Sequence, residues 1–124
     1  RLVKTLAETS ANFSVLHLLQ DDLFWKEGWG EIIKQPEFKE RDFITEFNEL
    51  LEEFEENVDD LELSSGTTVF IGRENPFSKS GDFSIMISRC RLPKGKKGII
   101  SILGPTRMAY DRNIALLDSL TKLL

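Results

Sequence analysis

This sequence has few residues of the types that act as nucleophiles, general bases or metal ligands. It contains one histidine, His17, and one cysteine, Cys90. His17 lies in the apolar run 13–19 with no Cys, Asp or Glu in a recognisable motif, which favours a histidine satisfied within a core or sheet over a catalyst or metal ligand. Arg91 follows Cys90, and a neighbouring base lowers a thiol pKa, but the sequence supplies no partner base for a nucleophile. We therefore expect no enzyme activity, no bound metal and no cofactor.

The carboxylates are concentrated in one segment. Eleven acids and one base, Arg41, lie between Glu40 and Glu62, which gives this segment a net charge of about −10 and the remainder about +5. A uniformly acidic helix face is more typical of a solvated surface than of a catalytic acid/base pair. Because no aromatic residues are interleaved in the basic loop, it is a poor platform for nucleic acid. Most of the basic excess lies in Lys79, Arg89, Arg91, Lys94, Lys96 and Lys97, opposed locally by Asp82.

Two predicted strand ends run into turns that contain glycine. The segment 70–76 leaves a strand through Gly72 and turns at Asn75 and Pro76. The segment 104–108, Gly-Pro-Thr-Arg-Met, leads from another strand directly into a helix. Thr106 is the expected N-cap of that helix, because its hydroxyl can accept a hydrogen bond from one of the first free backbone N–H groups.

Arg107 follows this cap and allows two interpretations. A helix N-terminus with an arginine in its first turn can bind an anion. Alternatively, Arg107 pairs with a local carboxylate such as Glu74 and fastens the two strand ends together. We favour the ion pair, because no phosphate-type glycine loop accompanies the arginine.

Periodicity predicts the elements that position these residues. The strongest helix spans 42–61, where apolar residues recur at steps of one, three and four. A second helix runs from about 107 to the end of the chain after the break at Gly104 and Pro105. Further helices are expected over 2–12 and 28–35, and strands over 13–19, 67–71, 83–89 and 98–103, the last two joined as an antiparallel hairpin through 93–96. The pattern indicates an α+β domain whose antiparallel sheet of about four strands carries amphipathic helices.

Three aromatic residues surround a glycine near the N-terminus. Trp25 and Trp29 flank Gly28, and large rings in such a place favour local core over an interface. The same rings together with Phe24 are the candidates for an interface with a second subunit or a chaperone if they are exposed.

Length and composition define the class of protein. The 124 residues have a mass of 14.2 kDa, with 40% hydrophobic and 30% charged residues, as in one ordinary globular domain spanning 1–124. No apolar run approaches the roughly 20 residues that span a bilayer, so no membrane contact is expected. The chain opens without Met or a signal-peptide core, and we expect a part of a longer cytoplasmic protein.

One long segment of the sequence has the pattern of a known family. Residues 98–110, Gly-Ile-Ile-Ser-Ile-Leu-Gly-Pro-Thr-Arg-Met-Ala-Tyr, resemble the C-terminal signature of the HrcA family of bacterial heat-inducible transcription repressors. Residues 35–38, 71–75 and 83–88 resemble three further elements of that family in the same order, and the resemblance spans about 23–124. The signature positions are Gly72, Glu74, Asn75, Gly104, Pro105, Thr106, Arg107, Met108 and Tyr110.

The resemblance implies a fold and a role. It implies a GAF-like regulatory and dimerisation region of a repressor that acts on chaperone operons through an inverted-repeat operator, CIRCE. It further implies a homodimer, support from a GroEL-type chaperonin, and DNA contact only through an N-terminal winged-helix domain that this chain lacks. The sequence departs from the family at Ala109, where members commonly have Asp, and near Cys90, where they commonly have an aromatic residue.

The alternatives are a GAF-like small-molecule sensor and a protein-interaction domain without a role linked to DNA. A pocket lined by polar groups behind the sheet would favour the sensor. A sheet face filled by Phe and Ile would favour the structural role.

Overall fold

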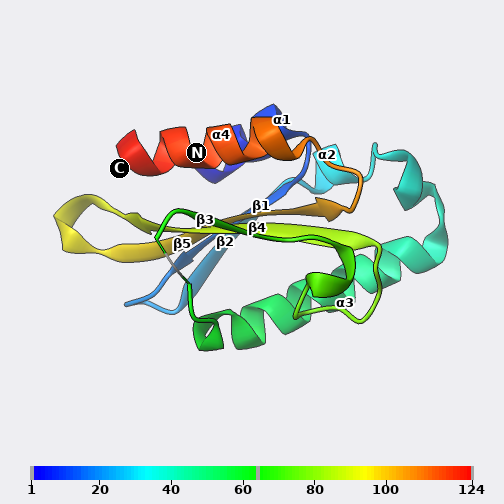
Figure 1. The fold of residues 1–124 in the computed structure, drawn as a ribbon, viewed down its shortest axis with the longest axis horizontal. Helices are drawn as coiled ribbons and strands as arrows, with labels where there is room; N and C mark the ends of the chain where they lie inside the picture. The colour runs from blue at the N-terminus through cyan, green and yellow to red at the C-terminus, as the bar shows by residue number, and fades with distance from the viewer. Residues whose placement is uncertain (1, 64, 124) are drawn as a thin grey trace.

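A computed structural model describes residues 2–63 and 65–123 (Figure 1). Its α-helices are α1 (Leu2–Ser10), α2 (Trp29–Ile32), α3 (Arg41–Asn57) and α4 (Tyr110–Leu123). Its strands are β1 (Phe13–Leu18), β2 (Leu23–Glu27), β3 (Thr67–Phe70), β4 (Phe83–Arg91) and β5 (Lys97–Pro105). Short 3-10 turns occupy η1 (Pro36–Lys39), η2 (Val58–Asp60), η3 (Gly72–Glu74) and η4 (Pro93–Gly95).

The five strands form one open antiparallel sheet in the order β2-β1-β5-β4-β3. The first long strand, β1, therefore lies inside the sheet and pairs with the last, with Val15 opposite Ser101. Figure 1 shows α1 and α4 together on one face of the sheet and α3 across the other. This arrangement confirms the α+β class with helices packed on an antiparallel sheet, which has five strands where about four were predicted.

Each face of the sheet has its own core. The α3 face is filled by aromatic and branched side chains whose rings meet edge to face, as between Phe38 and Phe47. The opposite face packs a smaller aliphatic set under α1 and α4. The buried α3-side residues include Phe13, Val15, Phe38, Phe47, Phe54, Phe83, Ile85, Ile87 and Ile99; those on the other face include Val3, Leu6, Leu16, Met86, Ile100, Ile102 and Leu117.

The packing on the α3 face bears on the two roles that the sequence left open for the sheet. In the described part of the chain, Phe and Ile side chains fill the space between α3 and the sheet. By the criterion given above, this favours the structural role over the small-molecule sensor. Among the described residues, we also find no helix with the length and apolar character needed to cross a bilayer.

Most predicted elements are confirmed, with shifts at their ends. The helix expected over 42–61 is α3, which ends at Asn57 and continues as η2. The sequence pattern missed β2, a short edge strand. The last helix begins at Tyr110 rather than near Arg107, and residue 124, at its expected end, lies outside the described residues.

Candidate functional site

The Gly-Pro-Thr-Arg-Met segment leaves β5 in close contact with the first turn of the chain. A Cβ on Gly104 would overlap the Asn12 side-chain oxygen, so a larger residue at this position would displace that side chain. Pro105 is buried at the end of β5 and pairs with Phe83. Met108 packs against the core beneath α4. The segment is thus a close-packed crossing between β5 and α4.

The expected N-cap role of Thr106 is wrong. Since α4 starts four residues later, no helix N–H lies within reach of the Thr106 hydroxyl as an N-cap would require. The hydroxyl instead donates to the Gly81 carbonyl at 2.6 Å, and the Thr106 N–H donates to the Asp82 carbonyl at 2.8 Å. Thr106 therefore joins the segment to the turn that precedes β4.

The signature residues of the two strand ends meet through hydroxyl groups. The Gly72 N–H donates to the Ser84 hydroxyl at 3.1 Å, and that hydroxyl lies 2.9 Å from the Tyr110 hydroxyl. Tyr110 also donates to the Thr106 carbonyl. Gly72 has a φ of +59°, which favours glycine at the start of η3. Ser84, which carries this connection, was not singled out from the sequence.

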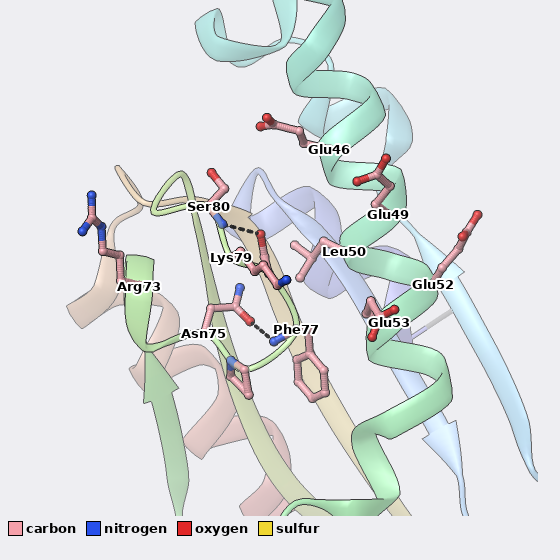
Figure 2. A pocket seen from close by; sticks show the side chains of 12 residues that line it. Glu46, Glu49, Leu50, Glu52, Glu53, Arg73, Asn75, Phe77, Lys79 and Ser80 are labelled. Atoms are coloured by element: carbon pink, nitrogen blue, oxygen red, sulfur yellow. Dashed lines mark hydrogen bonds between the residues drawn. The ribbon is translucent and has the colours of Figure 1, made fainter.

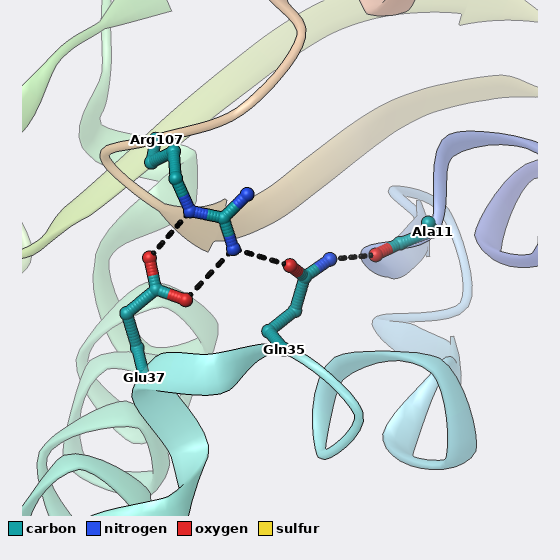
Figure 3. A network of polar contacts seen from close by, with 4 residues as sticks. All are labelled: Ala11, Gln35, Glu37 and Arg107. Atoms are coloured by element: carbon teal, nitrogen blue, oxygen red, sulfur yellow. Dashed lines mark hydrogen bonds and ion pairs between the residues drawn. The ribbon is translucent and has the colours of Figure 1, made fainter.

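Arg107 forms the ion pair that we expected, but with a different partner. Its guanidinium bonds both carboxylate oxygens of Glu37, at 2.9 and 2.8 Å, and the Gln35 side chain at 2.8 Å (Figure 3). Gln35 in turn donates to the Ala11 carbonyl at 2.7 Å. The hydrogen bond from Arg107 holds the pKa of Glu37 below its ordinary value. Glu74 instead accepts from the Ile71 N–H and closes η3.

The Arg107 network connects three distant parts of the chain. It ties the segment before α4 to η1 and, through Gln35, to the turn between α1 and β1. Because the guanidinium is engaged by a bidentate carboxylate, the site does not present a free cation to an anion. The structure therefore supports the ion-pair interpretation of Arg107.

Asn75 lines a surface groove between α3 and the segment 73–80. The groove has a volume of about 900 Å³, with carboxylates on its α3 wall and Lys79 on the other (Figure 2). The Asn75 side-chain oxygen accepts from the Phe77 N–H at 2.9 Å and shapes the turn. Its amide nitrogen is buried without a hydrogen-bond partner. The carboxylates on the wall belong to Glu46, Glu49, Glu52 and Glu53.

The three aromatic candidates for an interface do not lie on one face. Phe24 stacks on His17 and packs into the α3-side core. Trp25 is opposite Leu16 in the register and so lies on the other face, 49% exposed. Trp29 is 41% exposed, and its ring meets that of Phe13 edge to face with the ring centroids 5.2 Å apart. The core interpretation is therefore wrong for Trp25 and holds for one side of Trp29.

Cys90 and His17 are both buried. Burial raises the pKa of the Cys90 thiol to about 11, which outweighs any effect of the neighbouring bases. His17 is 1% exposed, and its Nε2 lies 3.1 Å from the Asp22 carboxylate. Its place in the sheet is as expected, but one ring nitrogen is left without a hydrogen bond.

The matches to known proteins agree with this geometry. A family model described as the HrcA protein C-terminal domain matches residues 1–114, which include every signature position above. The chain belongs to the HrcA family. Proteins named heat-inducible transcription repressor HrcA are 32% identical over 98 residues in Dehalococcoides mccartyi, 33% over 115 in Brevibacillus brevis and 37% over 97 in Listeria welshimeri.

These HrcA relatives are much longer than this chain. The alignments cover 77%, 87% and 77% of the chain but 28%, 34% and 28% of the respective relatives. A crystal structure of a hypothetical protein has a similar fold, with a TM-score of 0.62 and 19% identity over 80% of this chain and 30% of that one. The signature segments of HrcA thus form, in this chain, a structural junction between strands and helices.

Proposed function

We propose that residues 1–124 form a single domain, the C-terminal regulatory and dimerisation region of a heat-inducible transcription repressor. The observation that carries the proposal is the match of the HrcA C-terminal domain to 1–114, together with the connected Gly72, Ser84 and Tyr110 junction. In this role the domain performs no catalytic step and works in the cytoplasm.

The proposed protein represses chaperone operons through the CIRCE inverted repeat, which a winged-helix domain outside this chain contacts. A homodimer would hold two such DNA-binding domains at the spacing of the palindromic site, because operator symmetry mirrors protein symmetry. The acidic face of α3 supports the assignment of DNA contact to the winged-helix domain rather than to this one, since a surface with this charge repels phosphate.

The temperature signal in this proposal is the folding equilibrium of the domain. A domain stabilised by only a few kcal/mol loses its folded population over a few degrees of warming. A GroEL-type chaperonin would restore the folded form until other unfolded proteins occupy it. The exposed rings of Trp25 and Trp29 are the proposed chaperonin or dimer contacts.

The test is operator binding by the full-length protein across a temperature ramp, with and without chaperonin. Light scattering run in parallel gives the mass of the repressor. We expect a dimer whose operator occupancy falls on warming and recovers with chaperonin. A monomer that binds the operator fully at every temperature without chaperonin would refute the proposal.

A further inference from the structure

A cluster of charged residues surrounds the buried ring of His17, away from the groove and from Arg107. The ring lies parallel to Phe24 with centroids 4.0 Å apart. Its Nε2 is 3.1 Å from Asp22 Oδ1, in the turn between β1 and β2. Its Nδ1 is 3.2 Å from Asp59 Oδ1, in η2. Both ring nitrogens therefore face a carboxylate.

A neutral imidazole cannot satisfy both carboxylates, because it has one N–H donor and one lone pair. The contact between Nε2 and Asp22 has hydrogen-bond geometry, which assigns the proton of the neutral ring to Nε2. Nδ1 then presents its lone pair to Asp59, and it is buried without a hydrogen-bond partner. Since a lone pair and a carboxylate oxygen repel each other, a cation belongs between them.

The distances suit a metal ion in that position. Two donor atoms that share a tetrahedral Zn²⁺ at about 2.0–2.1 Å are roughly 3.3 Å apart. The separation of Nδ1 and Asp59 Oδ1 is 3.2 Å, and this contact is not a hydrogen bond. Asp22 occupies the position of a carboxylate that accepts the other ring N–H and so fixes the orientation of a metal-binding histidine.

We propose that His17 Nδ1 and Asp59 Oδ1 bind a divalent transition-metal cation such as Zn²⁺, with Asp22 orienting the imidazole. An imidazole ligand favours zinc and its neighbours over magnesium or calcium. The Asp59 side chain is 56% exposed and lines a surface hollow of about 870 Å³, so the carboxylate side of the site is open to solvent while His17 Nδ1 is buried. The bound ion joins β1 to the end of α3.

The experiment titrates the metal-free chain with ZnCl₂ by calorimetry at neutral pH, and with Co²⁺ by visible absorption. We expect one ion per chain. Asp59→Asn and His17→Gln should each weaken binding at least about tenfold, and Asp22→Asn should weaken it by a smaller factor. Asp59 is exposed, so its variant remains folded and keeps the test valid if His17→Gln unfolds.

Two matched variants separate this site from general attraction of cations. Asp60→Asn removes the same charge from the next residue of η2, and Cys90→Ser removes a thiol that lines the same hollow. Both should bind Zn²⁺ as tightly as the natural chain. No saturable binding at millimolar Zn²⁺, or equal binding by the Asp59→Asn variant, would overturn the proposal.

Discussion

Burial rather than neighbouring charge determines the chemistry of Cys90. A thiol whose pKa is about 11 is almost wholly protonated at neutral pH, and the thiolate is the reactive form. We expect iodoacetamide to alkylate Cys90 in the folded chain at least about a hundredfold more slowly than in urea, with a rate that rises as pH approaches 11. Mass spectrometry of timed samples measures both rates, and equal rates would contradict the burial argument.

Glu37 gives a residue-scale prediction about pH. Its pKa is lowered in the folded state, so its contribution to stability is present above its unfolded pKa, about 4.3, and is lost as pH falls through the lower folded value. At neutral pH, Glu37→Gln should reduce the free energy of unfolding by up to about 1 kcal/mol, since Arg107 is largely exposed.

The difference between Glu37→Gln and the natural chain should therefore shrink below about pH 4. Urea unfolding at a series of pH values measures it. Glu49→Gln, on the exposed α3 wall of the groove, is the matched control and should show no such change. A difference that stays constant down to pH 2 would mean that the Arg107 contact does not hold Glu37 ionised.

At the scale of elements, the N-terminus of α4 lacks a side-chain cap, and a substitution there can raise the stability of the domain. The Ala109 carbonyl accepts from the Asn113 N–H, so Ala109 occupies the N-cap position without a side chain able to cap. Ala109→Asp should raise the free energy of unfolding by about 0.5–1 kcal/mol through capping and the helix dipole. Ala115→Asp, exposed in the middle of α4, is the control and should lower it. A lower urea midpoint for Ala109→Asp would disprove this cap assignment.

Thr106 contributes through a contact between elements rather than through a cap. Thr106→Val removes the hydroxyl that donates to the Gly81 carbonyl and should cost about 1 kcal/mol in urea unfolding. Thr106→Ser keeps the donor and should lose less. An unchanged midpoint for Thr106→Val would show that this bond contributes nothing.

The elements also show what can be predicted from a sequence of this kind. The regular apolar spacing of α3 and the branched residues of β4 and β5 encode those elements locally, and the family signature marks the junction around Arg107. The partner of Arg107 is 70 residues away in the sequence, and no local pattern encodes that pairing. For the same reason, the contact between His17 and Asp59 could not be predicted from the sequence. The edge strand β2 was missed because it is short and mostly exposed, and its sequence Leu-Phe-Trp-Lys-Glu does not alternate apolar and polar residues.

At the scale of the whole molecule, the net negative charge opposes binding of this chain to DNA. The net charge is −5, and in the described structure the long helix α3 carries acids over most of its exposed face. We expect the isolated chain not to bind an inverted-repeat duplex, because no helix among the described residues is basic enough to enter a major groove. Fluorescence anisotropy at low salt is the measurement, and sequence-dependent binding below micromolar concentration would contradict the prediction.

The position of β1 inside the sheet has a consequence for synthesis. The edge of β1 that pairs with β5 stays uncovered during synthesis until β5 leaves the ribosome, because Phe13 pairs with Leu103. At 5–20 residues per second, this interval lasts roughly 5–20 s, during which an apolar strand has an open edge. Pairing between such distant segments is also intrinsically slow. Substitutions within the two strands cannot shorten the interval. A circular permutation can, because α1 and α4 lie side by side (Figure 1). Joining them would leave only α4 and α1 between β5 and β1 in the chain, so β1 would leave the ribosome much sooner after β5.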